Sequence, residues 1–131
     1  MSQWTDRLIN PRAITGLYDG PPPLEDFQLQ ELRLEERGPD CFIRGVLSCF
    51  PDHPRVNWPP EAQRLQIRLS LSAVEDINVS GRVGAGIVDL KIERAEDGFG
   101  VAIKAEGDDV EFEVFGIALQ LIGMKPLVGG Q

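Results

Sequence analysis

A chain of 131 residues, 42% hydrophobic and 26% charged, has the size and composition of one globular domain, which excludes a disordered chain. Its formal net charge of −8 repels phosphate backbones and anionic lipids, and no stretch approaches the roughly 18 apolar residues of a membrane span. Because Met1–Asp6 also lacks the features of a signal peptide, we expect one cytoplasmic domain over residues 1–131, with neither nucleic acid nor membrane as a partner.

The one helical pattern lies near the N-terminus. Asn10 can cap a helix whose first position would be Pro11. Ile14, Leu17 and Tyr18 then recur at helical spacing, which predicts a short helix with one buried face.

The residues around this helix indicate how it is placed. Ile9 and Ile14 stand where a hydrophobic staple would put them, and Trp4 is expected to anchor the segment on the core. The helix must end before Pro21–Pro23, because successive prolines forbid helical backbone.

From Phe27 onward the apolar residues recur at every second position, which is typical of strands with one buried face. The phase of this alternation changes near Gln30 and Glu31, which predicts a β-bulge. After a turn, residues 41–50 are expected to form a second strand.

A proline-rich, irregular loop over residues 50–60 separates that strand from the next and is long enough to be functional. A clean alternation from Leu65 to Leu71 predicts the next strand. Ile77 and Val79 indicate a short further strand, which the glycine-rich residues 81–86 connect to the C-terminal third.

The C-terminal third has the alternation of a meander. Its apolar segments are Val88–Ile92, Val101–Ile103 and Val110–Val114. A loop at residues 95–98 would pair Ile92 with Val101, and a turn at residues 107–108 would set Lys104 between Asp89 and Glu111 on the outer face. A last strand is expected to contain Ile117, Leu119 and Leu121, in a new phase. We therefore predict a mainly β, α+β fold, an antiparallel β-sandwich or partly open barrel with one short N-terminal helix.

Candidate chemistry is sparse in this sequence. His53 follows Asp52, but adjacent residues rarely give the geometry of a general base and its carboxylate. Cys41 and Cys49 would lie about 27 Å apart along one strand, too far for a disulfide. Three Cys and His residues in total are too few for a typical zinc site. We expect no catalytic residues, no metal and no cofactor, and therefore no enzyme.

Candidate partner-binding residues come from the outer face of the meander and from the proline-rich loop. The outer-face candidates are Asp89, Glu93, Glu111 and Glu113, with Glu106 and Asp109 beside them. Only Lys91 and Lys104 dilute this negative charge, so a basic partner would relieve the repulsion and associate faster. Trp58 in the loop is the alternative contact.

Short sequence landmarks are spread along most of the chain. They are Trp4, Asn10-Pro11, Leu17-Tyr18, Pro23-Leu24, Leu32 with Leu34, Gly38-Pro39, Phe50-Pro51, Trp58, Leu65 to Leu71, Asp97-Gly98 and Ile117. In these landmarks the chain resembles the immunity protein 50 family of bacterial polymorphic toxin systems. The resemblance implies a cytoplasmic inhibitor that binds a cognate toxin domain stoichiometrically, without catalytic residues. Residues 81–86 and the tail after Gly123 depart from the pattern and leave the toxin-facing surface unassigned.

Functions of other classes stay open. A small β-barrel could bind an apolar ligand, with Trp4, Tyr18 and Trp58 at its mouth. A self-associating structural subunit could pair through exposed edge strands, since the sequence leaves the oligomeric state undetermined. A small enzyme that uses a pair of carboxylates is the third alternative.

Overall fold

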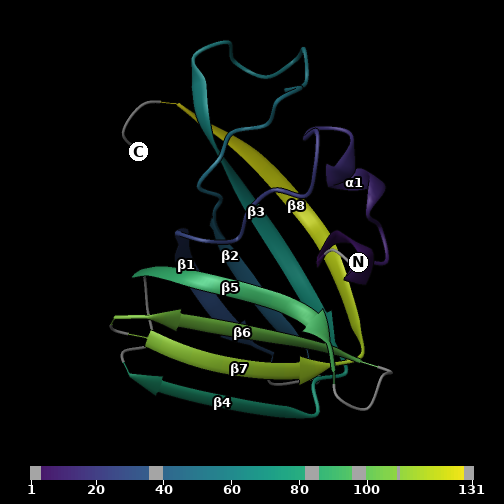
Figure 1. Ribbon diagram of the computed structural model, residues 1–131, viewed down its shortest axis with the longest axis vertical. Helices are drawn as coiled ribbons and strands as arrows, with labels where there is room; N and C mark the ends of the chain where they lie inside the picture. The colour runs from purple at the N-terminus through teal and green to yellow at the C-terminus, as the bar shows by residue number, and fades with distance from the viewer. Residues whose placement is uncertain (1–3, 36–39, 82–85, 96–99, 109, 129–131) are drawn as a thin grey trace.

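The computed structural model describes residues 4–35, 40–81, 86–95, 100–108 and 110–128. Within these ranges a 3-10 turn and one turn of α-helix precede the strands (Figure 1). The elements are η1 (Trp4–Arg7), α1 (Arg12–Thr15), β1 (Phe27–Leu34), β2 (Cys41–Val46), β3 (Ala62–Ser72), β4 (Asp76–Gly81), β5 (Gly86–Arg94), β6 (Val101–Gly107), β7 (Val110–Gly116) and β8 (Ala118–Val128).

The strands form one antiparallel sheet in the order β4-β7-β6-β5-β1-β2-β3-β8, with β4 and β8 as its two ends. Figure 1 shows β5, β6, β7 and β4 crossing in front of β1, β2, β3 and β8, so the sheet folds back over its own buried face. The predicted mainly β, antiparallel fold is confirmed. A single continuous sheet that stays open is closer to the partly open barrel than to the sandwich.

The core lies between the two halves of this folded sheet. Each strand sends alternate side chains inward, and burying each large aliphatic side chain contributes about 1.5–3 kcal/mol. The largest side chains with almost no exposure are Phe27, Phe112, Ile14, Leu29, Ile43, Leu65, Ile67, Leu69, Leu71, Ile103, Leu119 and Val88. The alternation predicted from Leu65 to Leu71 is therefore confirmed, as is the inward face of the meander.

Strand β1 carries the predicted bulge. Its pairing with β2 passes from Leu29 opposite Gly45 to Glu31 opposite Arg44, which leaves Gln30 as the extra residue. On its other side β1 pairs with β5 only through residues 27–29. Pairing with the rest of β5 ends there because the chain turns at residues 25–26, where Asp26 has a left-handed φ of 54°.

The meander register was predicted wrongly by two residues. Ile92 pairs with Ile103 rather than with Val101, and Lys104 lies between Lys91 and Glu113 rather than between Asp89 and Glu111. The reason is that both connections are centred one residue later than predicted, with Arg94 still paired to Val101 across the first and Glu106 to Glu111 across the second. A shift of two residues keeps every side chain on its predicted face. The predicted Asp97-Gly98 turn lies outside the described residues.

The predicted N-terminal helix is only a single turn, and its predicted cap is wrong. Pro11 is the N-cap, without a side-chain capping bond. The Asn10 amide instead donates from Nδ2 to the Leu121 carbonyl (2.8 Å) and accepts the Leu121 N–H at Oδ1 (3.0 Å). Ile9 is 63% exposed, so no staple forms, whereas Ile14 is fully buried as predicted. The unpaired edge of β8 thus competes successfully for the amide that would have capped the helix.

Other strand ends also differ from prediction. The second strand ends at Val46 rather than at residue 50, and Cys41 is buried while Cys49 is exposed beyond it. Ile117 precedes β8 and is 45% exposed, although Leu119 and Leu121 point inward as expected. Among the described residues, no helix is long and apolar enough to cross a membrane.

Candidate partner-binding surfaces

The outer face of β5, β6 and β7 carries a continuous row of carboxylates. Asp89 on β5 is directly opposite Glu106 on β6, which in turn pairs with Glu111 on β7. We call these residues the acidic row. Like charges in directly opposed positions destabilise a sheet, because their Cβ atoms lie only about 4.5–5.5 Å apart. Folding alone therefore does not favour this arrangement, and a basic partner would relieve it.

The neighbouring row on the same face is largely neutralised. Glu113 on β7 pairs with Lys104 on β6, which pairs with Lys91 on β5. The Lys104 ammonium also forms a 3.2 Å ion pair with Glu93. The predicted patch is thus divided, with Asp89 in the acidic row and Glu93 beside a lysine.

The acidic row ends at a small hollow at the turn end of β6. The hollow has a volume of about 230 Å³ and is lined by Asp26, Ile87, Val88, Asp89, Glu106, Gly107 and Asp108. The Asp26 N–H donates to Asp89 Oδ1 (3.0 Å), and Asp26 has the left-handed φ of 54° that aspartate tolerates. Ile87 is 56% exposed. In the described part of the chain, no group of Asp, Glu, His or Cys is placed to hold a metal ion.

Trp58 lies on a different surface, beside β8. Its ring packs partly against the core, with the Phe50 ring centroid at 6.3 Å and the Arg55 guanidinium at 6.0 Å. It borders a hollow of about 250 Å³ that Ala13, Arg55 and residues 121–124 also line. Strands β1, β2 and β3 separate β8 from β5 in the sheet, so the structure does not bring Trp58 together with the acidic row.

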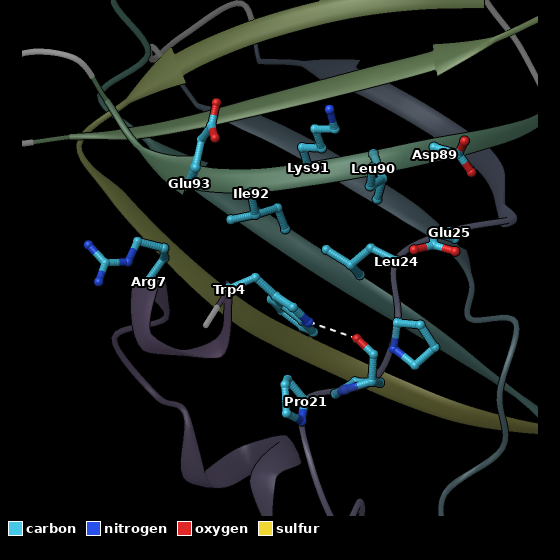
Figure 2. Close-up of a pocket in the computed structure, with 12 residues that line it drawn as sticks. Trp4, Arg7, Pro21, Leu24, Glu25, Asp89, Leu90, Lys91, Ile92 and Glu93 are labelled. Carbon is cyan, nitrogen blue, oxygen red and sulfur yellow. Dashed lines mark hydrogen bonds between the residues drawn. The ribbon is translucent and has the colours of Figure 1, made fainter. Parts of the chain in front are cut away.

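A larger groove, which the sequence did not predict, runs along β5. It has a volume of about 690 Å³ and is lined by Trp4, Arg7, residues 21–25 and residues 89–93, and we call it the β5 groove. Figure 2 shows Trp4 on the side opposite β5, with its Nε1 donating to the Pro22 carbonyl (2.8 Å). This bond and contact with the core confirm Trp4 as the predicted anchor.

The proline-rich loop is tied to the segment after α1. His53 Nε2 lies 2.6 Å from Asp19 Oδ1, and the Asp19 N–H donates to Asp52 Oδ2 (3.0 Å). The carboxylate partner of His53 is therefore Asp19 and not its neighbour Asp52. The hydrogen bond that the Asp19 carboxylate accepts from the ring, together with the negative charge of Asp19, raises the pKa of His53 above its ordinary 6.5.

The aromatic residues do not converge on one ligand pocket. The Tyr18 hydroxyl donates to the Cys49 carbonyl (2.6 Å), and burial raises the pKa of this phenol. Trp4 and Trp58 line separate hollows. Large side chains fill the space between the two halves of the sheet, so the geometry does not favour an apolar ligand inside the barrel.

Surfaces of these kinds suit a protein that binds another protein. A family model matches residues 10–125, which is most of the chain. That family is described as immunity protein 50, and the chain belongs to it. The resemblance seen in the sequence is thereby confirmed. No curated protein and no solved structure matches the chain significantly.

Proposed function

We propose that this protein is a cytoplasmic immunity protein that binds a cognate toxin domain and neutralises it stoichiometrically, as a single domain over residues 1–131. The observation that carries the proposal is the match to the immunity protein 50 family over residues 10–125. Neutralisation by binding needs a surface that complements the toxin and needs no catalytic group in the inhibitor. The outer face of β5–β7, the β5 groove and the hollow beside Trp58 are the surfaces available for this contact.

The charge of the protein supports a basic toxin surface as the partner. The chain carries a formal net charge of −8, and the acidic row concentrates negative charge on one face. Complementary fields of this kind raise the association rate more than the final affinity, and added salt screens them.

We assign the contact to Asp89, Glu93, Glu111 and Glu113, with Trp58 as the alternative. The register supports Glu111 over Glu113 as a contact, because Glu111 lies in the acidic row whereas Glu113 pairs with Lys104. Glu111→Lys should slow association with the toxin domain at least several-fold, and Glu113→Lys, on the same strand and face, should slow it less. Stopped-flow rates at low and high salt test this ranking. If the two substitutions slow association equally, or not at all, and Trp58→Ala abolishes binding, the contact lies at the proline-rich loop instead.

Co-expression tests the proposed function itself. We expect the toxin to be encoded next to this gene, so the probe is the C-terminal domain of the protein encoded directly upstream, expressed in a bacterial host with and without this chain. We expect the domain alone to stop growth, and this chain to restore growth and co-purify with the domain. An immunity protein from an unrelated family serves as the control. A toxic domain that this chain neither rescues nor binds would contradict the proposal.

A further inference from the structure

Strand β5 has one complete edge and one incomplete edge. Along β6 it is paired from Val88 to Arg94. Along β1 its pairing stops at Val88, which is opposite Phe27. Beyond that point the Leu90 N–H donates to the Leu24 carbonyl (3.0 Å). Most of the second half of β5 therefore has no strand on this side and borders η1 and the β5 groove.

The direction of the free backbone groups follows from this bond. Backbone groups of alternate residues point to the same edge of an antiparallel strand, so Ile92 presents its N–H and C=O on the same side as the Leu90 N–H. Among the described residues, no backbone hydrogen bond reaches Ile92 from that side. Unpaired groups on a strand edge are a template for the addition of another strand.

Of the two end strands of the sheet, β8 has a protected outer edge, in contrast to the incomplete edge of β5. On β8 the Ile9 N–H donates to the Leu119 carbonyl (2.8 Å), and the Asn10 side chain bonds both backbone groups of Leu121. Further along β8, Pro126 has no N–H to offer. These hydrogen bonds and this proline disfavour the addition of a strand at β8.

The walls of the β5 groove indicate the chemistry of its occupant. Trp4 and Leu24 supply apolar surface opposite β5, where inward side chains of an added strand would lie. Glu25 and Asp89 lie together at one end of the groove, and Arg7 and Glu93 lie at the other (Figure 2). Because Glu93 is already engaged by Lys104, the Glu25 and Asp89 end holds the carboxylates that are most available to a cation.

We propose that the β5 groove receives an extended segment of the toxin domain, which adds to the free edge of β5 as a further strand. Its alternate side chains are apolar toward Trp4 and basic toward Glu25 and Asp89. This inference rests on the proposed function and specifies how the toxin is held. Backbone bonds to Ile92 supply the affinity, and the carboxylates set the position of the segment along β5.

Amide hydrogen exchange resolved by NMR tests this arrangement in the complex of the full chain with the toxin domain that the chain neutralises in the co-expression test. The Ile92 amide should exchange at least ten-fold more slowly in the complex than in the free protein. The Leu90 amide, which already bonds to Leu24, should change little, and so should the Met124 amide on β8. If the Ile92 amide is already protected in the free protein, residues of the chain itself fill the groove, and the inference is wrong.

A matched pair of charge reversals provides a second test. Glu25→Arg places a cation at the acidic end of the groove and should weaken toxin binding about ten-fold in calorimetry. Glu61→Arg makes the same change in an exposed loop and should leave binding unaltered. The chain could instead form a tight complex in which Ile92 exchange is unchanged and Glu25→Arg binds as well as Glu61→Arg. That result would contradict binding in the β5 groove and leave the proposed function intact. If this chain forms no complex with the toxic domain, both the groove proposal and the proposed function are wrong.

Discussion

Gly45→Ala should strongly destabilise the protein, because the Gly45 site has no room for a methyl group. A Cβ built there would lie 2.3 Å from both Cε2 and Cζ of the Phe27 ring and 2.6 Å from the Gln28 carbonyl oxygen. Phe27 is fully buried and cannot swing into solvent, and the carbonyl belongs to the β1 backbone. Either the ring or the β1–β2 ladder must therefore move.

The expected magnitude follows from these contacts. Overpacking of a well-filled core costs about 1–3 kcal/mol, and two clashes, one of them with backbone, place this case near the upper end. A loss of about 3 kcal/mol is a large part of the roughly 5–15 kcal/mol that stabilises a typical domain. For a chain of this size it should lower the Tm by about 10 °C.

Urea titration monitored by tryptophan fluorescence, with calorimetry for the Tm, measures the effect of Gly45→Ala. Gly16→Ala is the matched control, since no atom lies within 4 Å of a Cβ at Gly16 and its φ is −77°. That variant should be neutral or slightly stabilised. Trimming the ring with Phe27→Leu in the Gly45→Ala background should cost less than Phe27→Leu alone, because the two sites are coupled. A Gly45→Ala protein within about 0.5 kcal/mol of the wild type would refute the packing of Phe27 over Gly45.

Other predictions follow from burial and from ion pairing. Ile103→Ala should cost about 2–5 kcal/mol in urea titration, since Ile103 is fully buried between β5 and β7, and a cost below 1 kcal/mol would contradict this placement. Thiol titration at pH 8 should modify exposed Cys49 rapidly, whereas Cys41, whose pKa burial raises to about 11, should react only on unfolding. The NMR titration midpoint of His53 should lie above 6.5 and should fall toward 6.5 in Asp19→Asn. The His53–Asp19 pair therefore stabilises the fold fully below pH 6.5, and this stabilisation is lost as pH rises through the raised pKa. A wild-type midpoint at or below 6.5 would be inconsistent with the pair.

The predictable part of the fold is the part that local patterns determine. Alternation from Leu65 to Leu71 identifies a strand with one buried face, and a phase change identifies the bulge at Gln30. The same alternation cannot distinguish registers that differ by two residues, because both bury Ile92 and Ile103. The predicted pairing of the meander was wrong for this reason, although its faces were right.

Local sequence patterns could not predict contacts between segments that are distant in the chain. Asn10 has the residue type of a helix cap, but its amide bonds to Leu121, 111 residues away in the chain. The β5 groove likewise joins the N-terminal turn, the segment over residues 21–25 and β5. One local feature agrees with it, since Pro21–Pro23 lack the N–H groups that a strand beside β5 would need.

The directions of the candidate residues were predicted correctly, but their arrangement on the sheet was not. The outward direction of Asp89 and Glu111 followed from alternation, because residues on one face recur at every second position. Their organisation into the acidic row depends on the register, as does the pairing of Glu113 with Lys104. Trp58 lies on a separate surface, which no pattern in the sequence could establish.

Titration of toxin activity with the purified protein tests the central claim most directly. The toxin domain identified by the co-expression test is assayed at a concentration well above the Kd while this chain is added in steps. Stoichiometric neutralisation predicts a linear fall in activity that reaches zero at one molar equivalent, with a complex of the summed mass. Activity that persists at several molar equivalents, or that disappears at a small fraction of one equivalent, would contradict inhibition by one-to-one binding.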